Sequence, residues 1–255
     1  MGTFSFKKFK VQNERSAMKV NTDGVLLGAL MTLYPTDRRL LDVGTGTGTI
    51  ALMAAQRCLS LPSGEDNSIP AIRTVSDNLQ IDAIDIDEPS ALEAGMNFQA
   101  SDWSDHLSVY NMSLDEFAAS HNDRYDLIFS NPPYFEESLP APEGRRSNAR
   151  HTYSGLSYRE LLHFSAERLA ETGRFAIVLP ADQEASLTRY ARMCGMHLFR
   201  IVRVRTVPRK APGRIIAEFS RTRTDAPKEE LITIQDEGKY TVEYLSLMHD
   251  FYLFA

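Results

Sequence analysis

The sequence has 255 residues, of which 43% are hydrophobic and 24% are charged, so the chain can bury a sizeable core and lacks the composition of a disordered protein. No apolar run approaches the roughly 18 residues that a membrane span needs, and the basic start is not followed by the apolar region of a signal peptide. We therefore expect a cytoplasmic protein that is neither inserted in a membrane nor exported. The two distant cysteines, Cys58 and Cys194, favour a reducing compartment over a disulfide framework.

Basic residues are concentrated in two segments, although the net charge is −6. Residues 1–19 contain five Lys and Arg against one acid, and residues 200–223 contain eight against one. Since backbone phosphates are recognised by local charge, the two segments together predict a phosphate-binding face. The alternative is two solvated basic stretches, which charge alone favours slightly.

Helices and strands alternate through the first half of the sequence. Residues 60–80 lack periodicity and predict a loop or insertion, and Asp87 is interpreted as the side-chain cap of a helix that begins near Pro89. The predicted elements of this half are a helix at 25–30, a strand at 39–43, a helix at 50–55, a strand at 81–86, a helix at 89–100, a strand at 107–110, a helix at 115–119 and a strand at 125–130.

The second half begins with a predicted long mobile loop at residues 131–155. Ser157 and Glu160 form a capping box that opens a helix at 161–170, and Gly173 is predicted to end that helix. The remaining predicted elements are a strand at 175–179, a helix at 182–193 and two strands at 196–207 and 215–220 that form an antiparallel hairpin. This order predicts an α/β fold with a mostly parallel sheet and an antiparallel edge.

The turn after the strand at 39–43 marks the expected ligand site, because ligands of doubly wound sheets lie at the carboxyl ends of the strands. Gly44, Gly46 and Gly48 follow a G-x-G-x-G spacing, whereas the dinucleotide pattern G-x-G-x-x-G would need a glycine where Thr49 stands. An ordinary tight turn would have the same spacing. At the end of the next strand Asp85 can accept both hydroxyls of a ribose, so the two features together predict a nucleoside cofactor.

Asn131-Pro132-Pro133-Tyr134 directly follows the predicted strand at 125–130. A turn of this composition can be purely structural, but at this place it suits chemistry on a planar nitrogen. The lone pair of an exocyclic adenine amine is delocalised into the ring, and the Asn131 side-chain oxygen and the Pro132 carbonyl can accept its two N–H groups and aim the lone pair at a methyl donor. The prolines hold that carbonyl rigidly, and Tyr134 can stack on the base.

This motif, behind a glycine turn and an acid, resembles that of methyltransferases that modify planar nitrogen groups with S-adenosylmethionine. Further segments narrow the resemblance to the bacterial valine-tRNA adenine N6-methyltransferase family. The similar segments are residues 18–29 (MKVNTDGVLLGA), 41–48 (LDVGTGTG), 130–135 (SNPPYF), 149–152 (ARHT) and 218–221 (EFSR). The resemblance implies S-adenosylmethionine as cofactor and methylation of N6 of the adenine at tRNA position 37.

The resemblance also implies a fold and a domain organisation. The fold is a Rossmann-like class I methyltransferase with a seven-stranded, mostly parallel sheet and an antiparallel C-terminal hairpin. One methyltransferase domain is expected over residues 1–255, with a basic N-terminal extension and first helix at 1–35, a cofactor-binding α/β core at 36–195, and the hairpin and tail at 196–255. We expect this domain to act as a monomer.

Site residues follow from the family motif, position by position. The expected catalytic residues are Asn131, Pro132, Pro133 and Tyr134. The expected cofactor contacts are Thr22, Asp23, Asp42, Gly44, Gly46, Gly48, Asp85, Ser113 and Asn131. Thr22 and Asp23 equally suit a helix cap, and Ser113 stands where an acid commonly holds the cofactor's adenine, so that contact is expected to be weaker.

The basic segments are then interpreted as the surface that binds tRNA. The expected RNA contacts are Lys7, Lys8, Lys10, Arg150, His151, Arg203, Arg205 and Arg209. His151 lies in the predicted basic loop and is interpreted as a substrate contact rather than a general base. No metal site is predicted, because the six histidines are scattered.

Three other functions remain open on the sequence. A protein glutamine methyltransferase faces the same planar-nitrogen problem, but the basic segments argue against it. A DNA adenine methyltransferase would be expected to carry a separate domain for reading the sequence of DNA. A non-catalytic, RNA-binding module that holds the cofactor would have no use for the complete motif at residues 131–134.

Overall fold

The computed structural model describes residues 2–59, 78–133 and 156–255. Most of the predicted insertion at 60–80 lies outside these ranges, as do residues 134–155 with Tyr134, Arg150 and His151. Within the described ranges no helix has both the length and the apolar character that crossing a membrane requires.

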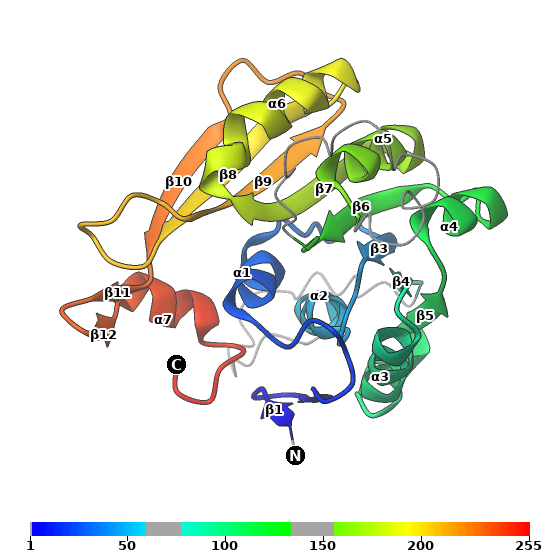
Figure 1. Cartoon of the computed structure of the whole chain (residues 1–255), viewed down its shortest axis with the longest axis horizontal. Helices are drawn as coiled ribbons and strands as arrows, with labels where there is room; N and C mark the ends of the chain where they lie inside the picture. The colour runs from blue at the N-terminus through cyan, green and yellow to red at the C-terminus, as the bar shows by residue number, and fades with distance from the viewer. Residues whose placement is uncertain (1, 60–77, 134–155) are drawn as a thin grey trace, which may run out of the picture.

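An eight-stranded sheet forms the centre of the molecule (Figure 1), in the order β10-β8-β9-β7-β6-β3-β4-β5. Its strands are β3 (Arg39–Val43), β4 (Gln80–Asp85), β5 (Leu107–Asn111), β6 (Tyr125–Ser130), β7 (Leu169–Pro180), β8 (His197–Arg205), β9 (Arg214–Ser220) and β10 (Lys228–Thr233). Strands β3 to β7 run parallel, and β9 is antiparallel to both β7 and β8. The predicted parallel sheet with an antiparallel hairpin is therefore confirmed.

The eighth strand, β10, was not predicted. It pairs in parallel with β8 at the edge of the sheet. Its sequence, KEELIT, is mostly exposed or half-buried and contains three charged residues, so it carries neither the apolar run nor the clean alternation by which a strand is recognised. Edge strands commonly carry charge, which discourages pairing with another chain.

In the described parts of the chain, seven helices cover the two faces of the sheet. On one face α1 (Thr22–Leu30), α2 (Thr49–Leu59), α3 (Glu88–Gln99) and α7 (Val242–Met248) share a core with every second residue of the strands. On the other face α4 (Leu114–Ser120), α5 (Tyr158–Arg168) and α6 (Glu184–Met193) share a second core. The smaller elements are the hairpins β1 (Thr3–Ser5) with β2 (Lys10–Gln12) and β11 (Gln235–Asp236) with β12 (Lys239–Tyr240), and two short 3-10 turns at Ser104–His106 and Ala181–Gln183.

The prediction that Gly173 ends a helix is wrong. Helix α5 stops at Arg168, and strand β7 begins at the next residue. Residue pairing along β6 passes from Tyr125 opposite Leu169 to Leu127 opposite Arg174, so β7 carries extra residues in a bulge that includes Gly173. A Cβ at Gly173 would lie only 2.6 Å from the Tyr125 carbonyl oxygen, so the glycine allows a close approach of two backbones rather than the end of a helix.

Replacing Gly173 with alanine is expected to destabilise the protein by about 1–3 kcal/mol, because either the bulge or β6 has to move. Gly213→Ala is the matched control, since a Cβ placed there has no described atom within 4 Å apart from those of Gly213 and its two chain neighbours. Urea unfolding of both variants measures the difference. Equal midpoints for the two variants would contradict the close-approach explanation.

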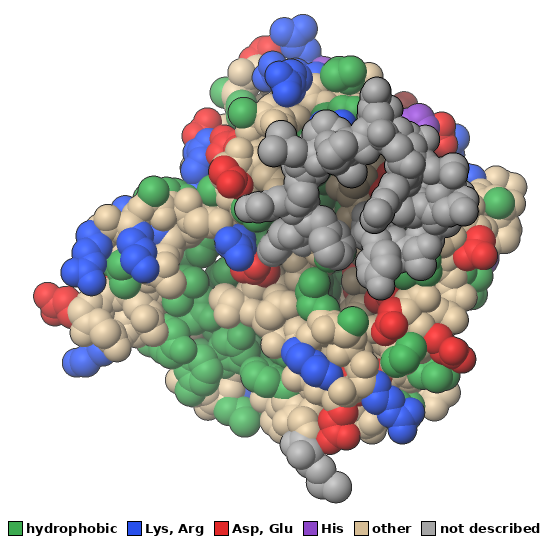
Figure 2. Space-filling view, viewed as in Figure 1, with side chains coloured by type: hydrophobic (Ala, Val, Ile, Leu, Met, Phe, Trp, Pro, Cys, Tyr) green, Lys and Arg blue, Asp and Glu red, His purple; other side chains and the backbone are tan. Residues whose placement is uncertain are grey.

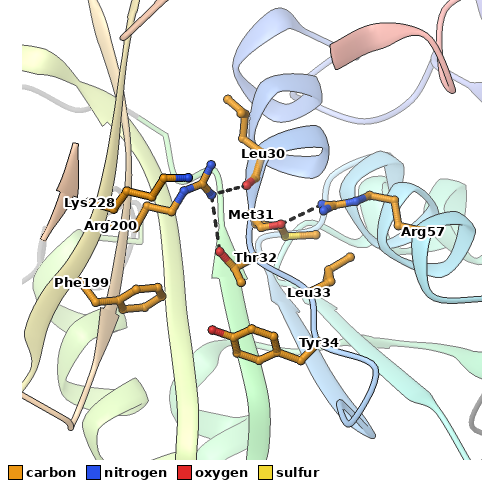
Figure 3. Close-up of a pocket in the computed structure, with 9 residues that line it drawn as sticks. All are labelled: Leu30, Met31, Thr32, Leu33, Tyr34, Arg57, Phe199, Arg200 and Lys228. Atoms are coloured by element: carbon orange, nitrogen blue, oxygen red, sulfur yellow. Dashed lines mark hydrogen bonds between the residues drawn. The ribbon is translucent and has the colours of Figure 1, made fainter. Parts of the chain in front are cut away.

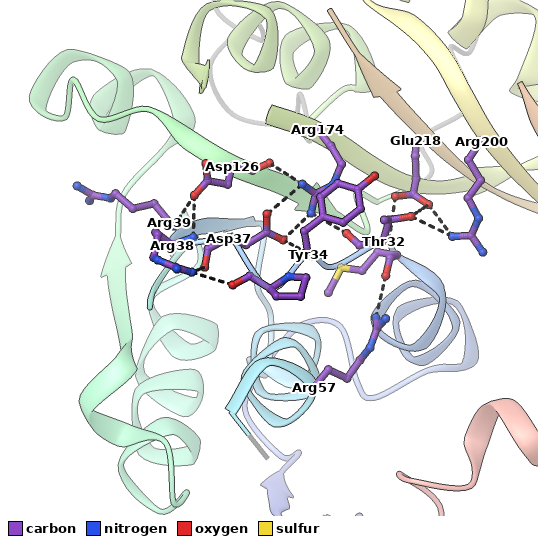
Figure 4. Close-up of polar contacts among 12 residues, drawn as sticks. Thr32, Tyr34, Asp37, Arg38, Arg39, Arg57, Asp126, Arg174, Arg200 and Glu218 are labelled. Atoms are coloured by element: carbon purple, nitrogen blue, oxygen red, sulfur yellow. Dashed lines mark hydrogen bonds and ion pairs between the residues drawn. The ribbon is translucent and has the colours of Figure 1, made fainter. Parts of the chain in front are cut away.

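Arginine side chains fix the linker between α1 and β3 (Figure 4). Arg174 is buried and pairs with Asp37 through two contacts of 2.6 and 3.0 Å, and it also donates to the Thr32 carbonyl. Arg57 donates to two carbonyls at the end of α1, where the helix dipole favours a cation. Glu218 on β9 accepts the backbone N–H and the hydroxyl of Thr32. These contacts hold the carboxyl end of α1 against the sheet and so orient its amino end.

Candidate active site

Strand β3 lies between β4 and β6. Strands β4 and β5 follow on one side of β3, and β6 and β7 follow on the other side, so the strand order reverses at β3. The segments that follow β3, β4 and β6 therefore meet at one edge, as expected at the switch point of a doubly wound sheet. A small pocket lies there, lined by residues 18–21 with Gly24 and Val25, by residues 44–47 with Thr49 and Ile50, and by Asn131. The structure thus brings the glycine turn and Asn131 together in the lining of one pocket.

The glycine turn depends on backbone conformations that favour glycine. Gly46 has φ +57° and Gly48 has φ +78°. A Cβ at Gly48 would lie 2.5 Å from a ring carbon of Phe98 on α3, so this turn also packs closely against the neighbouring helix. The backbone N–H groups of Gly44 and Thr45 both donate to the Ile84 carbonyl on β4. The turn is therefore pinned to the end of the next strand.

Asp85 ends β4 directly beside the turn. Its carboxylate accepts the Gly46 N–H at 2.8 Å and the Asp87 N–H at 2.9 Å. Burial raises the pKa of Asp85, and these two hydrogen bonds oppose that rise. Asp87 caps α3 by accepting the Ser90 N–H, which confirms its predicted structural role.

Asp42 lies near the end of β3, just before the glycine turn, and is fully buried. The Thr45 hydroxyl donates to its Oδ2 at 2.8 Å, whereas no described residue makes a hydrogen bond to its Oδ1. Burial raises the pKa of Asp42 to about 7. Hydrogen bonds from the Thr45 hydroxyl and the Ala51 backbone oppose this rise, and Asp42 is not among the residues that line the pocket.

Asn131 follows β6 with 6% of its surface exposed. Ser130 before it donates to the Val43 carbonyl at 2.7 Å, which ties the end of β6 to the end of β3. The Asn131 amide nitrogen lies 3.4 Å from Oδ1 of Asn21 and 3.6 Å from the sulfur of Met18. Pro132 is buried and Pro133 is half-buried, so the described part of the motif packs against the rest of the domain.

Thr22 and Asp23 lie next to the pocket but do not line it. Thr22 is exposed, and Asp23 forms an ion pair of 2.8 Å with Arg214 at the start of β9. The cap of α1 is Asn21, whose side chain accepts the Gly24 N–H. Sequence reasoning therefore missed Asn21 and Gly24 as lining residues, although a capping asparagine three residues before the N–H that it accepts is a recognisable signal.

Ser113 also has a structural task. It caps α4, and its hydroxyl donates to Oε2 of Glu116 at 2.8 Å in a complete capping box. The side chain of Ser113 is thus engaged by its own helix.

The predicted RNA contacts near the N-terminus differ in their surroundings. The Lys7 ammonium donates to the carbonyls of His249 and Ala255, so it helps to fix the C-terminal segment. Lys8 and Lys10 are exposed on the β1–β2 hairpin.

Most of the basic segment at 200–223 is engaged within the protein. Arg203 pairs with Glu184 at 2.5 Å and with Glu229 at 2.7 Å, and Arg205 donates to a threonine hydroxyl and a proline carbonyl. Arg209 in the β8–β9 loop is exposed. Figure 2 accordingly shows Lys and Arg side chains in separate groups on this face rather than in one continuous patch.

A larger cavity of about 470 Å³ lies beside the end of α1, between that helix and β8 (Figure 3). Tyr34, Phe199, Arg200 and Lys228 are among its nine lining residues, and none of the nine is a predicted cofactor or catalytic residue. This cavity is thus separate from the glycine turn, from Asp42 and Asp85, and from Asn131. Among the described residues there is no group of three or more potential metal ligands.

Comparisons with known proteins identify the fold and the family. A family model described as an RMKL-like methyltransferase domain matches residues 29–206. Among solved structures, a predicted O-methyltransferase from Agrobacterium tumefaciens has a TM-score of 0.59 at 13% identity and covers 90% of this chain and 96% of its own. A putative class I S-adenosylmethionine-dependent methyltransferase from Listeria monocytogenes has a TM-score of 0.51 at 12% identity, with coverage of 89% and 65%. These likenesses show the class I methyltransferase fold.

Similarity in sequence is more specific. A protein of Parabacteroides distasonis is 42% identical over 98% of this chain and 97% of its own length, and one of Yersinia pestis is 36% identical over 99% and 94%. Both carry the name tRNA1(Val) (adenine(37)-N6)-methyltransferase. Since relatives with this name match nearly the whole chain at more than a third of its positions, the chain belongs to the tRNA1(Val) (adenine(37)-N6)-methyltransferase family.

Proposed function

We propose that this protein transfers the methyl group of S-adenosylmethionine to the exocyclic N6 of an adenine in tRNA, at position 37 of a valine tRNA. The observation that carries the proposal is the position of Asn131 and Pro132 after β6, beside the glycine turn and Asp85. The name shared by the relatives supports the choice of RNA and of position. We further propose that it acts in the cytoplasm, where its proposed tRNA substrate is found, and that it acts as a monomer.

The residues at the switch point fit the cofactor. Asp85 would accept the ribose hydroxyls, and the turn at Gly44 and Gly46 leaves room for a close approach of the cofactor to the backbone. Asp42, near the end of β3, stays a predicted contact of the methionine end. When bound, the cofactor supplies an electrophilic methyl group on a positively charged sulfur.

The chain's own contribution is to prepare the nitrogen that accepts the methyl group. The Asn131 side-chain oxygen and the Pro132 carbonyl accept the two N–H groups of the adenine amine, which localises its lone pair and directs it. Fixed backbone at the two prolines keeps these acceptors in place. Tyr134 is proposed to stack on the base after the base leaves the stack of the anticodon loop.

The test uses three separate reactions, each with the protein and labelled S-adenosylmethionine. The first contains total tRNA, the second total protein and the third DNA. Label is expected in tRNA alone, as N6-methyladenosine in a valine tRNA, and a transcript with guanine at position 37 should take up none. Label in glutamine side chains or in DNA would overturn the proposal.

We expect tRNA binding to depend on the exposed lysines of the β1–β2 hairpin. Changing Lys8 and Lys10 to glutamate should weaken binding and lower the slope of log affinity against log salt by roughly one unit for each phosphate that is no longer neutralised. Arg203→Gln is the contrast, because the charge of Arg203 is already paired with two glutamates. Filter binding over a range of salt measures all three proteins. Identical slopes for the wild type and the lysine variant would show that the hairpin is only solvated surface.

A further inference from the structure

Helix α3 carries a buried polar stripe that the proposed chemistry does not use. Ser90, Glu93 and Asn97 are each only 1% exposed. Their spacing of three and then four residues places them on one face of the helix. Polar side chains are rarely buried without partners, so the question is what they hold.

Glu93 holds three consecutive backbone N–H groups from the N-terminal part of the chain. Its Oε1 accepts from Glu14 at 2.7 Å and from Arg15 at 2.9 Å, and its Oε2 accepts from Ser16 at 2.8 Å. Burial on its own would raise the pKa of Glu93, but these hydrogen bonds outweigh burial and lower it. The carboxylate therefore replaces the secondary-structure partners that this part of the backbone lacks.

Asn97 joins the same N-terminal part to the glycine turn. Its amide oxygen accepts the Gln12 N–H at 2.7 Å, and its amide nitrogen donates to the carbonyls of Gln12 at 3.1 Å and Thr47 at 2.9 Å. Ser90 adds a hydrogen bond of 3.0 Å to the hydroxyl of Ser16. The polar stripe of α3 thus contacts both the N-terminal part of the chain and the glycine turn.

We call residues 12–21 the strap. Beyond the part held by α3, the strap continues through residues 18–21, which line the pocket at the switch point. A Cβ added at Gly46 would lie 3.5 Å from the Ser16 hydroxyl and 3.6 Å from the Met18 carbonyl, so the strap faces the glycine turn with room for little more than one methyl group between them. Asn21, at the end of the strap, lies 3.4 Å from the amide nitrogen of Asn131.

We propose that Glu93, with Asn97 and Ser90, is a positioning residue for methyl transfer: it holds the strap against the glycine turn as a wall of the cofactor pocket. The proposal rests on the proposed function, since that pocket is assigned to S-adenosylmethionine. An apolar residue at 93 would leave the N–H groups of residues 14–16 without their acceptors, and the strap would be free to leave the turn.

The experiment compares Glu93→Gln with Glu88→Gln, in which an exposed glutamate of the same helix is changed. Glutamine keeps the size of Glu93, but its amide nitrogen would face backbone N–H groups. We expect Glu93→Gln to bind S-adenosylhomocysteine about tenfold more weakly by calorimetry, while Glu88→Gln binds like the wild type. In turnover on tRNA, KM for the cofactor should rise and kcat at saturation should stay within a few-fold, a split that general loss of stability would not produce.

Trypsin gives a readout that does not depend on activity. Arg15 and Lys19 lie exposed in the strap, and the wild-type backbone between residues 14 and 16 is held by Glu93. Glu93→Gln should be cut at these two sites faster than Glu88→Gln, and saturating S-adenosylhomocysteine should slow the cut. If Glu93→Gln fails to fold, Asn97→Ala serves in its place, because it removes the bridge to Thr47 and leaves the carboxylate.

Unchanged cofactor affinity together with an unchanged tryptic pattern in a folded variant would overturn the proposal. Failure of the proposed function looks different. If no tRNA were methylated but Glu93→Gln still lost affinity for S-adenosylhomocysteine, the role of the strap would stand and the choice of substrate would fall. If the wild type did not bind S-adenosylhomocysteine at all, both would fall.

Discussion

Asn131→Ala is expected to slow methyl transfer by a factor of ~10²–10³, the usual loss when one preorganised hydrogen-bonding group aimed at the transition state is removed. Its proposed task exists mainly at the moment of transfer, when the adenine amine gives up its conjugation. The Pro132 carbonyl, Asp85 and the glycine turn remain in place, so affinity for the cofactor should fall only by the few-fold that one lost contact of Asn131 accounts for, far less than the transfer rate. Single-turnover rates on purified tRNA, with calorimetry of cofactor binding, measure the two effects separately.

Asn131→Asp is the finer variant. A carboxylate still accepts hydrogen bonds but cannot donate to Asn21 and brings a charge, so intermediate activity is expected. Wild-type rates in Asn131→Ala, or a loss explained wholly by weaker cofactor binding, would mean that the motif is a structural turn.

Asp85→Ala is expected to weaken the binding of S-adenosylmethionine and of its demethylated product by a factor of ~10²–10³, since charge-assisted hydrogen bonds contribute about 1.5–3 kcal/mol each. The structure adds a second reason. Asp85 also accepts the Gly46 N–H, so its removal loosens the turn that approaches the cofactor. Isothermal calorimetry with both ligands measures the loss.

Asp87→Ala is the matched control for this prediction. Asp87 stands two residues away but caps α3, so its loss should lower stability by about 1 kcal/mol and leave affinity nearly unchanged. Equal affinities of Asp85→Ala and the wild type would remove Asp85 from the site.

Local signals explain which parts of the fold could be predicted. The strands at 39–43 and 125–130 match β3 and β6 residue for residue, because each is a short apolar run with a clear end. Gly173 misled the prediction, since a glycine after a helical pattern usually ends the helix, and only the neighbouring strand reveals the close approach that it serves. Strand β10 depends on its place beside β8 and not on its own pattern.

The site residues also divide into those that local sequence marks and those that depend on distant elements. Gly44, Asp85 and Asn131 could be proposed as site residues from the sequence, because Gly44 and Asn131 directly follow predicted strands and Asp85 stands at the end of one. The prediction that Arg203 contacts RNA rests on a count of charges along the chain, and such a count does not reveal its ion pairs with Glu184 and Glu229, which come from other elements. The partners of Glu93 lie about 77 to 79 residues away and are backbone groups, so no sequence pattern marks them.

The central position of β3 also bears on how the protein is made. Its partner β6 pairs Leu40 with Leu127, 87 residues later in the chain, and β6 in turn needs β7. While the ribosome has delivered only the first hundred residues, β3 therefore has one open edge and an apolar face without its cover. Contacts of such long sequence separation form slowly, so the nascent chain passes through a stage in which it is prone to aggregate and open to chaperones. The switch point that creates the site thus also makes the first half of the chain dependent on the second during synthesis.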